Sequence, residues 1–127
     1  MNRKLLWLDD CRSPFDGKWL SIYAVGYVLG SDDVTWAKDF DDFVTYFATR
    51  GMPDLICFDH DLGEGESGYD CAKWLVEYCM DQDLDVPAWK IQSSNPVGKE
   101  NINALLFNYR NSRKLQSSEK WDGIIGS

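Results

Sequence analysis

Four aspartates lie directly behind two short apolar runs of the chain, two behind each run: Asp9 and Asp10, then Asp59 and Asp61. Carboxylates that are brought together repel one another, so they need a bound cation or a raised pKa to coexist. Their oxygens are hard ligands that suit Mg²⁺ or Mn²⁺, which proteins often hold together with a substrate phosphate. We therefore expect Asp9, Asp10 and Asp59 to bind Mg²⁺ or Mn²⁺, although a single aspartate is often only a helix or turn cap.

The only histidine of the chain, His60, lies between Asp59 and Asp61. Flanking carboxylates favour the protonated imidazolium, and an imidazole can act as a general acid or base on a phosphate ester. A lone histidine is also a common structural residue, so both interpretations stay open at this point. The catalytic hypothesis takes His60, Asp59 and Asp61 together.

A polar turn precedes the last helical segment, and it contains four candidate phosphate-binding residues: Ser93, Ser94, Asn95 and Gly98. Hydroxyl groups, backbone amides and the positive end of a helix dipole can bind phosphate oxygens. The same residue types are also ordinary helix N-caps. The chain has no G-x-x-x-x-G-K-[ST] sequence, which excludes a nucleotide-binding P-loop.

Apolar runs and helical stripes alternate along the chain. Runs that are typical of buried strands cover residues 4–8, 34–37, 54–58 and 86–91. Apolar residues with helical spacing follow in three segments, at 39–51, 67–79 and 98–109. This alternation predicts an α/β fold in three layers, with a mainly parallel sheet of about four to five strands and helices on both faces.

Right-handed crossovers bring the carboxyl ends of parallel strands to one edge of the sheet, where open α/β sheets bind ligands. The polar residues expected to meet there are Asp9, Asp10, Asp59, His60, Asp61, Ser93 and Asn95. The length of 127 residues predicts a single domain. Residues 11–33 are expected to form an irregular insertion, and residues 112–127 a C-terminal tail without a regular element.

Composition restricts the partners of this chain. Its formal net charge is -8, and such an acidic surface repels a duplex phosphate backbone, so we expect no duplex DNA. The sequence contains neither a long apolar span nor a signal peptide, so we expect no association with a membrane.

Its four cysteines form no C-x-x-C pair, which favours reduced thiols and a cytoplasmic location. A small phosphorylated ligand or an RNA end is the expected partner, and a protein partner stays open.

Four segments together resemble a known family: LLWLDDCRSP, DLICFDHDLG, SGYDCAKWL and IQSSNPVGKENI. They are similar to the cyclic-phosphate-processing receiver family, a divergent branch of the response-regulator receiver fold that is common in phage and bacterial genomes. The resemblance implies a flavodoxin-like sheet in which Asp9 and Asp10 match the acidic pair of receivers. It also matches Asp59 to the aspartate that receivers phosphorylate, and Ser93 to their small hydroxyl residue. The implied activity is the processing of cyclic phosphates.

The chain departs from its relatives in two places. Ordinary receivers place a lysine after a fifth strand, and the sequence beyond Arg113 offers neither that strand nor a clear equivalent. A phosphorelay from a histidine kinase is therefore not expected. The resemblance also implies a histidine where Gln92 stands. Because glutamine exchanges no proton at neutral pH, the protein could bind its ligand without turning it over.

Three functions follow from these residues. The first is a metal-assisted phosphoesterase that acts on 2',3'-cyclic RNA ends or cyclic nucleotides, with His60 as general acid or base. The second is an aspartyl-phosphate phosphatase in which Asp59 attacks phosphorus and Asp61 is the acid or base. The third is a non-catalytic module that binds a nucleotide signal or a host protein, with an anti-defence role in which a phage protein counteracts the defence of its host. If the chain is encoded by a phage, its location is the host cytoplasm.

Overall fold

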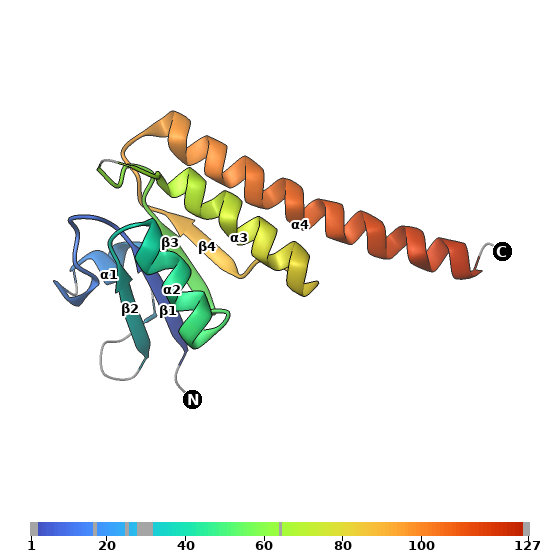
Figure 1. The fold of residues 1–127 in the computed structure, drawn as a ribbon, viewed down its shortest axis with the longest axis horizontal. Coiled ribbons are helices and arrows are strands. Elements are labelled where there is room, and N and C mark those ends of the chain that lie inside the picture. The colour runs from blue at the N-terminus through green and yellow to red at the C-terminus, as the bar shows by residue number, and fades with distance from the viewer. Residues whose placement is uncertain (1–2, 17, 25, 28–31, 64, 126–127) are drawn as a thin grey trace.

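Four parallel strands form the sheet, in the order β2-β1-β3-β4. The computed structural model describes residues 3–16, 18–24, 26–27, 32–63 and 65–125 (Figure 1). The elements in chain order are β1 (Lys4–Leu8), a 3-10 turn η1 (Pro14–Asp16), α1 (Lys18–Tyr23), β2 (Asp33–Ala37), α2 (Phe40–Arg50), β3 (Leu55–Phe58), α3 (Gly68–Gln82), β4 (Ala88–Ile91) and α4 (Pro96–Ile125). The predicted α/β fold with a parallel sheet is confirmed.

The register of the strands brings their carboxyl ends to one edge of the sheet. Strand β1 pairs with β3 on one side, and β3 pairs with β4 through Phe58 and Ile91. The residues that follow the strands continue this pattern: the Asp9 N–H donates to the Ala37 carbonyl oxygen at 3.0 Å, and the Gln92 N–H to that of Phe58 at 2.8 Å. Asp9, Asp59 and Gln92 therefore follow three adjacent strands at the same edge.

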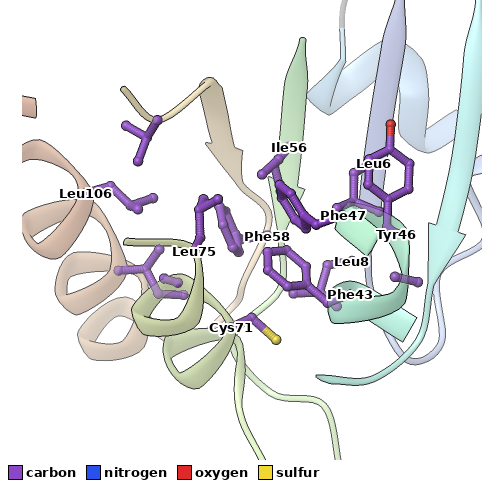
Figure 2. Packing of buried hydrophobic residues seen from close by; sticks show 14 of the residues in the cluster. Leu6, Leu8, Phe43, Tyr46, Phe47, Ile56, Phe58, Cys71, Leu75 and Leu106 are labelled. Atoms are coloured by element: carbon purple, nitrogen blue, oxygen red, sulfur yellow. The ribbon is translucent and has the colours of Figure 1, made fainter. Parts of the chain in front are cut away.

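Alternate residues of the central strands face two different apolar layers. Leu6, Leu8, Ile56 and Phe58 pack against side chains of α2, α3 and α4, among them Phe43, Phe47, Leu75 and Leu106 (Figure 2). Leu5, Trp7, Leu55 and Cys57 pack on the opposite face, where Trp19 of α1 and Ala24 cover them. Both faces of β1 and β3 are covered, which explains why these strands are continuously apolar in sequence.

Polar caps determine where two helices begin. The Asp39 side chain accepts the Asp42 N–H at 2.8 Å and starts α2. At α3, Ser67 and Asp70 form the capping box that their spacing predicts, with the Ser67 N–H donating to Asp70 Oδ2 at 2.8 Å. This capping box is important for the site, because it fixes the start of α3 directly after the loop that follows Asp59.

Two segments differ from the expectations. The segment 11–33 contains η1 and α1, while its residues 17, 25 and 28–31 lie outside the described part of the chain. Helix α4 continues to Ile125, so the expectation of no regular element in 112–127 does not hold for 112–125. In Figure 1, α4 extends beyond α3 and the sheet. A helix that projects in this way needs no continuous apolar stripe, which is why its sequence shows no helical spacing there. Within the described ranges, no helix is long and apolar enough to cross a membrane.

Candidate functional site

The acidic residues at the strand ends differ in their exposure. Asp9 is 0% exposed and Asp59 is 7% exposed. Asp10 is exposed, and so is Asp61, whose side chain keeps 63% of its accessible surface. The two buried carboxyl groups need partners inside the protein, because an unpaired buried charge is strongly destabilising.

Asp9 has a partner for each of its carboxylate oxygens. Its Oδ1 accepts the backbone N–H groups of Cys11 at 3.0 Å and Arg12 at 2.9 Å. Its Oδ2 accepts the Gln92 side-chain amide at 3.1 Å and lies 3.7 Å from Nη1 of Arg12. Asp9 therefore stabilises the junction between β1, the following turn and β4.

Gln92 is 1% exposed and belongs to the same buried group. Besides its bond to Asp9, its Nε2 donates to the Leu8 carbonyl oxygen at 3.3 Å. Both neighbours are acceptors, so the orientation of the amide follows from chemistry: the reverse orientation would place Oε1 against two oxygens. The Oε1 atom has no hydrogen-bond partner among the described residues.

Arg12 is a site residue that the sequence analysis missed. Its Nη1 donates to the Gln92 carbonyl oxygen at 2.5 Å, and its guanidinium carbon lies 5.2 Å from the ring centroid of Trp19. A cation above an aromatic face is stabilised by the ring electrons. The available signal was its position three residues after Asp9, within the segment LLWLDDCRSP. The structure thus places a positive side chain at the acidic edge.

The pKa of Asp59 is raised to about 6, mainly because burial penalises its charged form. The charges of Asp9 and Asp10 raise this pKa further, while the Asp61 backbone N–H and the Arg12 charge lower it. Asp59 therefore changes its charge close to neutral pH. Its environment distinguishes it from exposed Asp61, although both flank the same histidine.

His60 and Asp61 form a hydrogen-bonded pair, with Nδ1 of the ring 2.9 Å from Oδ1 of the carboxylate. The pKa of Asp61 is lowered, first by this hydrogen bond; burial opposes that effect, and the His60 charge and the Asn95 side chain lower the pKa further. Because an ionised carboxylate only accepts hydrogen bonds, we assign the ring hydrogen to Nδ1. The neutral ring then carries its lone pair on Nε2, the atom that can accept a proton.

Two glycines fix the position of the Asp59–His60 segment. A Cβ atom at Gly98 would lie 2.4 Å from Cγ of the His60 ring, and one at Gly68 would lie 1.9 Å from the Asp59 carbonyl oxygen. The Gly68 N–H also donates to the His60 carbonyl oxygen at 2.8 Å. The first turns of α3 and α4 can approach His60 only because both positions lack a side chain. Gly68 was not among the site residues predicted from the sequence, and Gly98 was predicted to bind phosphate.

The polar turn before α4 mainly caps that helix. Asn95 Oδ1 accepts the Gly98 N–H at 3.0 Å, and Ser93 Oγ accepts the Asn95 N–H at 3.1 Å. Ser94 is exposed. Asn95 and Gly98 lie beside Asp61 and His60, so the turn belongs to the same edge of the sheet. Phosphate binding by Ser93, Ser94, Asn95 and Gly98 stays a prediction.

The structure brings two of the three expected metal ligands together, Asp9 and Asp10, but not Asp59. Among the described residues, one group of ligand atoms lies within 4.8 Å of one another: it consists of Asp9, Asp10 and Cys11, without Asp59. Burial and the charges of Asp9 and Asp10 raise the pKa of the Cys11 thiol, and a protonated thiol is a poor ligand for a hard cation. Since both Asp9 oxygens are already bonded, the donor set does not fit Mg²⁺ or Mn²⁺.

Comparison with known proteins identifies the family. The model of the cyclic-phosphate processing receiver domain matches residues 4–108. The chain belongs to this family. The match begins at β1 and ends within α4, so it contains every strand and all of the site residues described above. No curated protein matches this receiver domain.

Solved structures of receivers share the fold. The N-terminal domain of a three-domain response regulator/sensory box/GGDEF protein from Carboxydothermus hydrogenoformans has 25% identity and a TM-score of 0.51, over 80% of this chain and 74% of that one. The Francisella response regulator 1452 receiver domain has 17% identity and a TM-score of 0.50, over 91% and 99%. A fusion containing the yeast Spc42 trimeric coiled coil has 21% identity and a TM-score of 0.57, over 83% of this receiver domain and 64% of the fusion. This receiver domain therefore spans less than two thirds of the fusion.

We expect Asp59→Asn to stabilise the protein at neutral pH. The folded-state pKa of about 6 exceeds the ordinary aspartate value of 3.8, so the folded state holds more protons and the free energy of unfolding falls as the pH rises through this interval. A shift of about two units corresponds to at most about 3 kcal/mol at neutral pH. Urea unfolding of the wild type and the variant, at about pH 4 and about pH 7.5, should show the gain only at the higher pH.

Asp81→Asn, a change at an exposed aspartate in the last turn of α3, is the matched control and should not alter this pH dependence. An equal gain for Asp59→Asn at both pH values would contradict the raised pKa of Asp59. It would show that ionisation of this carboxyl group does not lower the free energy of unfolding.

We expect Gly98→Ala to displace the His60 ring. The new Cβ atom would approach the ring to less than van der Waals distance, so the contact between Nδ1 and Asp61 cannot persist unchanged. The ring proton signals of the single histidine, followed by NMR, should move strongly. Val97→Ala, at the exposed neighbouring position, should leave them in place. Unmoved signals in folded Gly98→Ala protein would contradict the packing described here.

Proposed function

We propose that this receiver domain hydrolyses a cyclic phosphate at the carboxyl edge of its sheet, with His60 as general acid and base. The observation that carries the proposal is the hydrogen-bonded His60–Asp61 pair, whose ring packs against Gly98 and which directly follows Asp59, a carboxyl group of raised pKa. The family description, cyclic-phosphate processing, supports the substrate class.

The proposed reaction consumes one water molecule. Nε2 of His60 takes a proton from water while the water oxygen forms a bond to phosphorus. One ester bond of the phosphate ring breaks, and its oxygen leaves with the proton that His60 returns. The imidazole is restored, and the product is an open phosphate monoester. The role of Asp61 is to orient the ring and to stabilise its protonated form, as an acidic partner does in other catalytic histidine sites.

Asp59 supports the binding of an anion when it is protonated. Because its pKa is about 6, the approach of a negatively charged phosphate can raise that pKa enough to protonate the group. A neutral carboxyl can donate a hydrogen bond to a phosphate oxygen. The same burial leaves Asp59 only 7% exposed, which restricts the approach of a substrate phosphorus and makes it a weaker candidate for the nucleophile of an aspartyl-phosphate phosphatase.

Binding without turnover is the second candidate function, and Gln92 favours it. This side chain occupies the position where a histidine was expected, and both of its N–H bonds serve buried structural acceptors. If a second proton-transfer group is required, the site retains only the ability to bind its ligand. The candidate ligands stay 2',3'-cyclic RNA ends and cyclic nucleotides. Four free thiols fit a reducing cytoplasm as the compartment.

We expect the wild type to open a cyclic phosphate and His60→Ala to lose at least about 100-fold in rate, which is the usual contribution of a positioned acid or base. Asp61→Asn should lose about tenfold because the ring is then less well oriented and its cation less stabilised. A panel of 2',3'-cyclic and 3',5'-cyclic nucleotides, with mass spectrometry of the products, measures this in EDTA, Mg²⁺ and Mn²⁺.

Arg113→Gln is the control for this assay, since Arg113 pairs with Asp83 at the far end of α3. Turnover that survives in His60→Ala would contradict the proposed role. Recovery of intact nucleotide bound to the wild type, without product, would identify a binding module.

A further inference from the structure

The acidic edge of the sheet contains a cation of its own. Nη1 of Arg12 is bonded to the carbonyl oxygen of Gln92 and lies 3.7 Å from Oδ2 of Asp9. The guanidinium also lies over the ring of Trp19 in α1. Contacts from the end of β1, the end of β4 and α1 therefore hold this one group in place.

These contacts use only part of the guanidinium. Within the described parts of the chain, the Nε and Nη2 atoms of Arg12 make no hydrogen bond, and 27% of the side chain remains accessible. Two donors in a fixed plane match two oxygens of a phosphate, which is the arrangement that makes arginine a common phosphate-binding residue. The same buried group provides an unused acceptor, Gln92 Oε1.

We propose that Arg12 is the phosphate-binding residue of this site and that its guanidinium takes the place of a divalent metal ion on Asp9. The proposal deepens the proposed function and rests on the same edge of the sheet. Asp9 binds the inner side of the guanidinium, and the ligand phosphate binds the outer side. A metal ion on Asp9 would have to displace both Arg12 and the Gln92 amide.

This arrangement selects the charge of the ligand. Arg12 already shares its positive charge with Asp9, and Asp10, Asp59 and Asp61 lie at the same edge. Such a site accommodates one negative charge better than two. A cyclic phosphate diester carries one negative charge, whereas the open monoester carries nearly two at neutral pH. The site should therefore bind the cyclic form more tightly and release the product.

Two binding measurements test the proposal. The first follows Mn²⁺ binding by paramagnetic broadening of protein NMR signals. The wild type should bind Mn²⁺ only weakly at the strand ends, and Arg12→Gln, which leaves Asp9 without its cation, should bind it at least about tenfold more tightly. Arg113→Gln makes the same change of charge far from the site and should behave as the wild type.

The second measurement titrates adenosine 2',3'-cyclic phosphate and adenosine 3'-monophosphate into the protein in EDTA. The wild type should bind the cyclic compound more tightly than the monophosphate, and Arg12→Gln should lose about tenfold or more in affinity for it. Arg12→Lys keeps the charge without the two coplanar donors, and should lose affinity while still excluding Mn²⁺. Circular dichroism establishes whether each variant is folded. If a variant does not fold, the weak Mn²⁺ binding of the wild type and its preference for the cyclic compound still test the proposal.

The outcomes separate this proposal from the proposed function. Tight Mn²⁺ binding by the wild type at the strand ends, or cyclic phosphate binding that requires Mn²⁺, would overturn the role of Arg12 even if the compound is hydrolysed. Equal binding of the cyclic compound by the wild type and folded Arg12→Gln would also overturn it. Metal-free binding that depends on Arg12, without any hydrolysis, would support Arg12 and overturn the proposed reaction alone.

Discussion

A carboxylate buried at the end of the first strand determines much of this structure. Asp9 has no exposed surface, and a charge in that position is tolerated only with several partners. Two backbone N–H groups, the Gln92 amide and the Arg12 guanidinium provide them. These partners come from the turn after β1 and from the end of β4, on either side of β3. Asp9 therefore joins the segments that enclose the site. The charges of Asp9 and Arg12 also act on the pKa of Asp59, in opposite directions.

Close backbone packing is the second constraint, and it acts on the histidine. Gly68 and Gly98 allow the first turns of α3 and α4 to approach the Asp59–His60 segment closely. The Asn95 cap fixes the start of α4, and the same side chain lowers the pKa of Asp61, which places the cap beside the histidine pair. The His60 ring is therefore oriented before any ligand binds, which is what an efficient general acid or base requires.

The sequence predicted the parallel sheet, its four strands, the capping box and the common edge, because apolar periodicity and strand-end acids are local patterns. It predicted neither the partners of Asp9 nor the role of Arg12, because both depend on the β4 segment approaching the end of β1. The contact of Gly98 with the His60 ring likewise depends on tertiary approach. The helix over 112–125 was missed because the stripe that identifies a helix arises from packing, and α4 projects beyond the sheet there.

We propose that the His60–Asp61 pair and Arg12 bind one phosphate together, without a metal ion. The most direct test is a long-range nitrogen NMR spectrum of the single histidine, recorded in EDTA before and after addition of adenosine 2',3'-cyclic phosphate. The account predicts that the neutral form of the ring has its hydrogen on Nδ1, and that the ligand shifts the signals of both His60 Nε2 and the Arg12 Nε–H. A ring with its hydrogen on Nε2, or signals that the nucleotide leaves unchanged, would contradict the account.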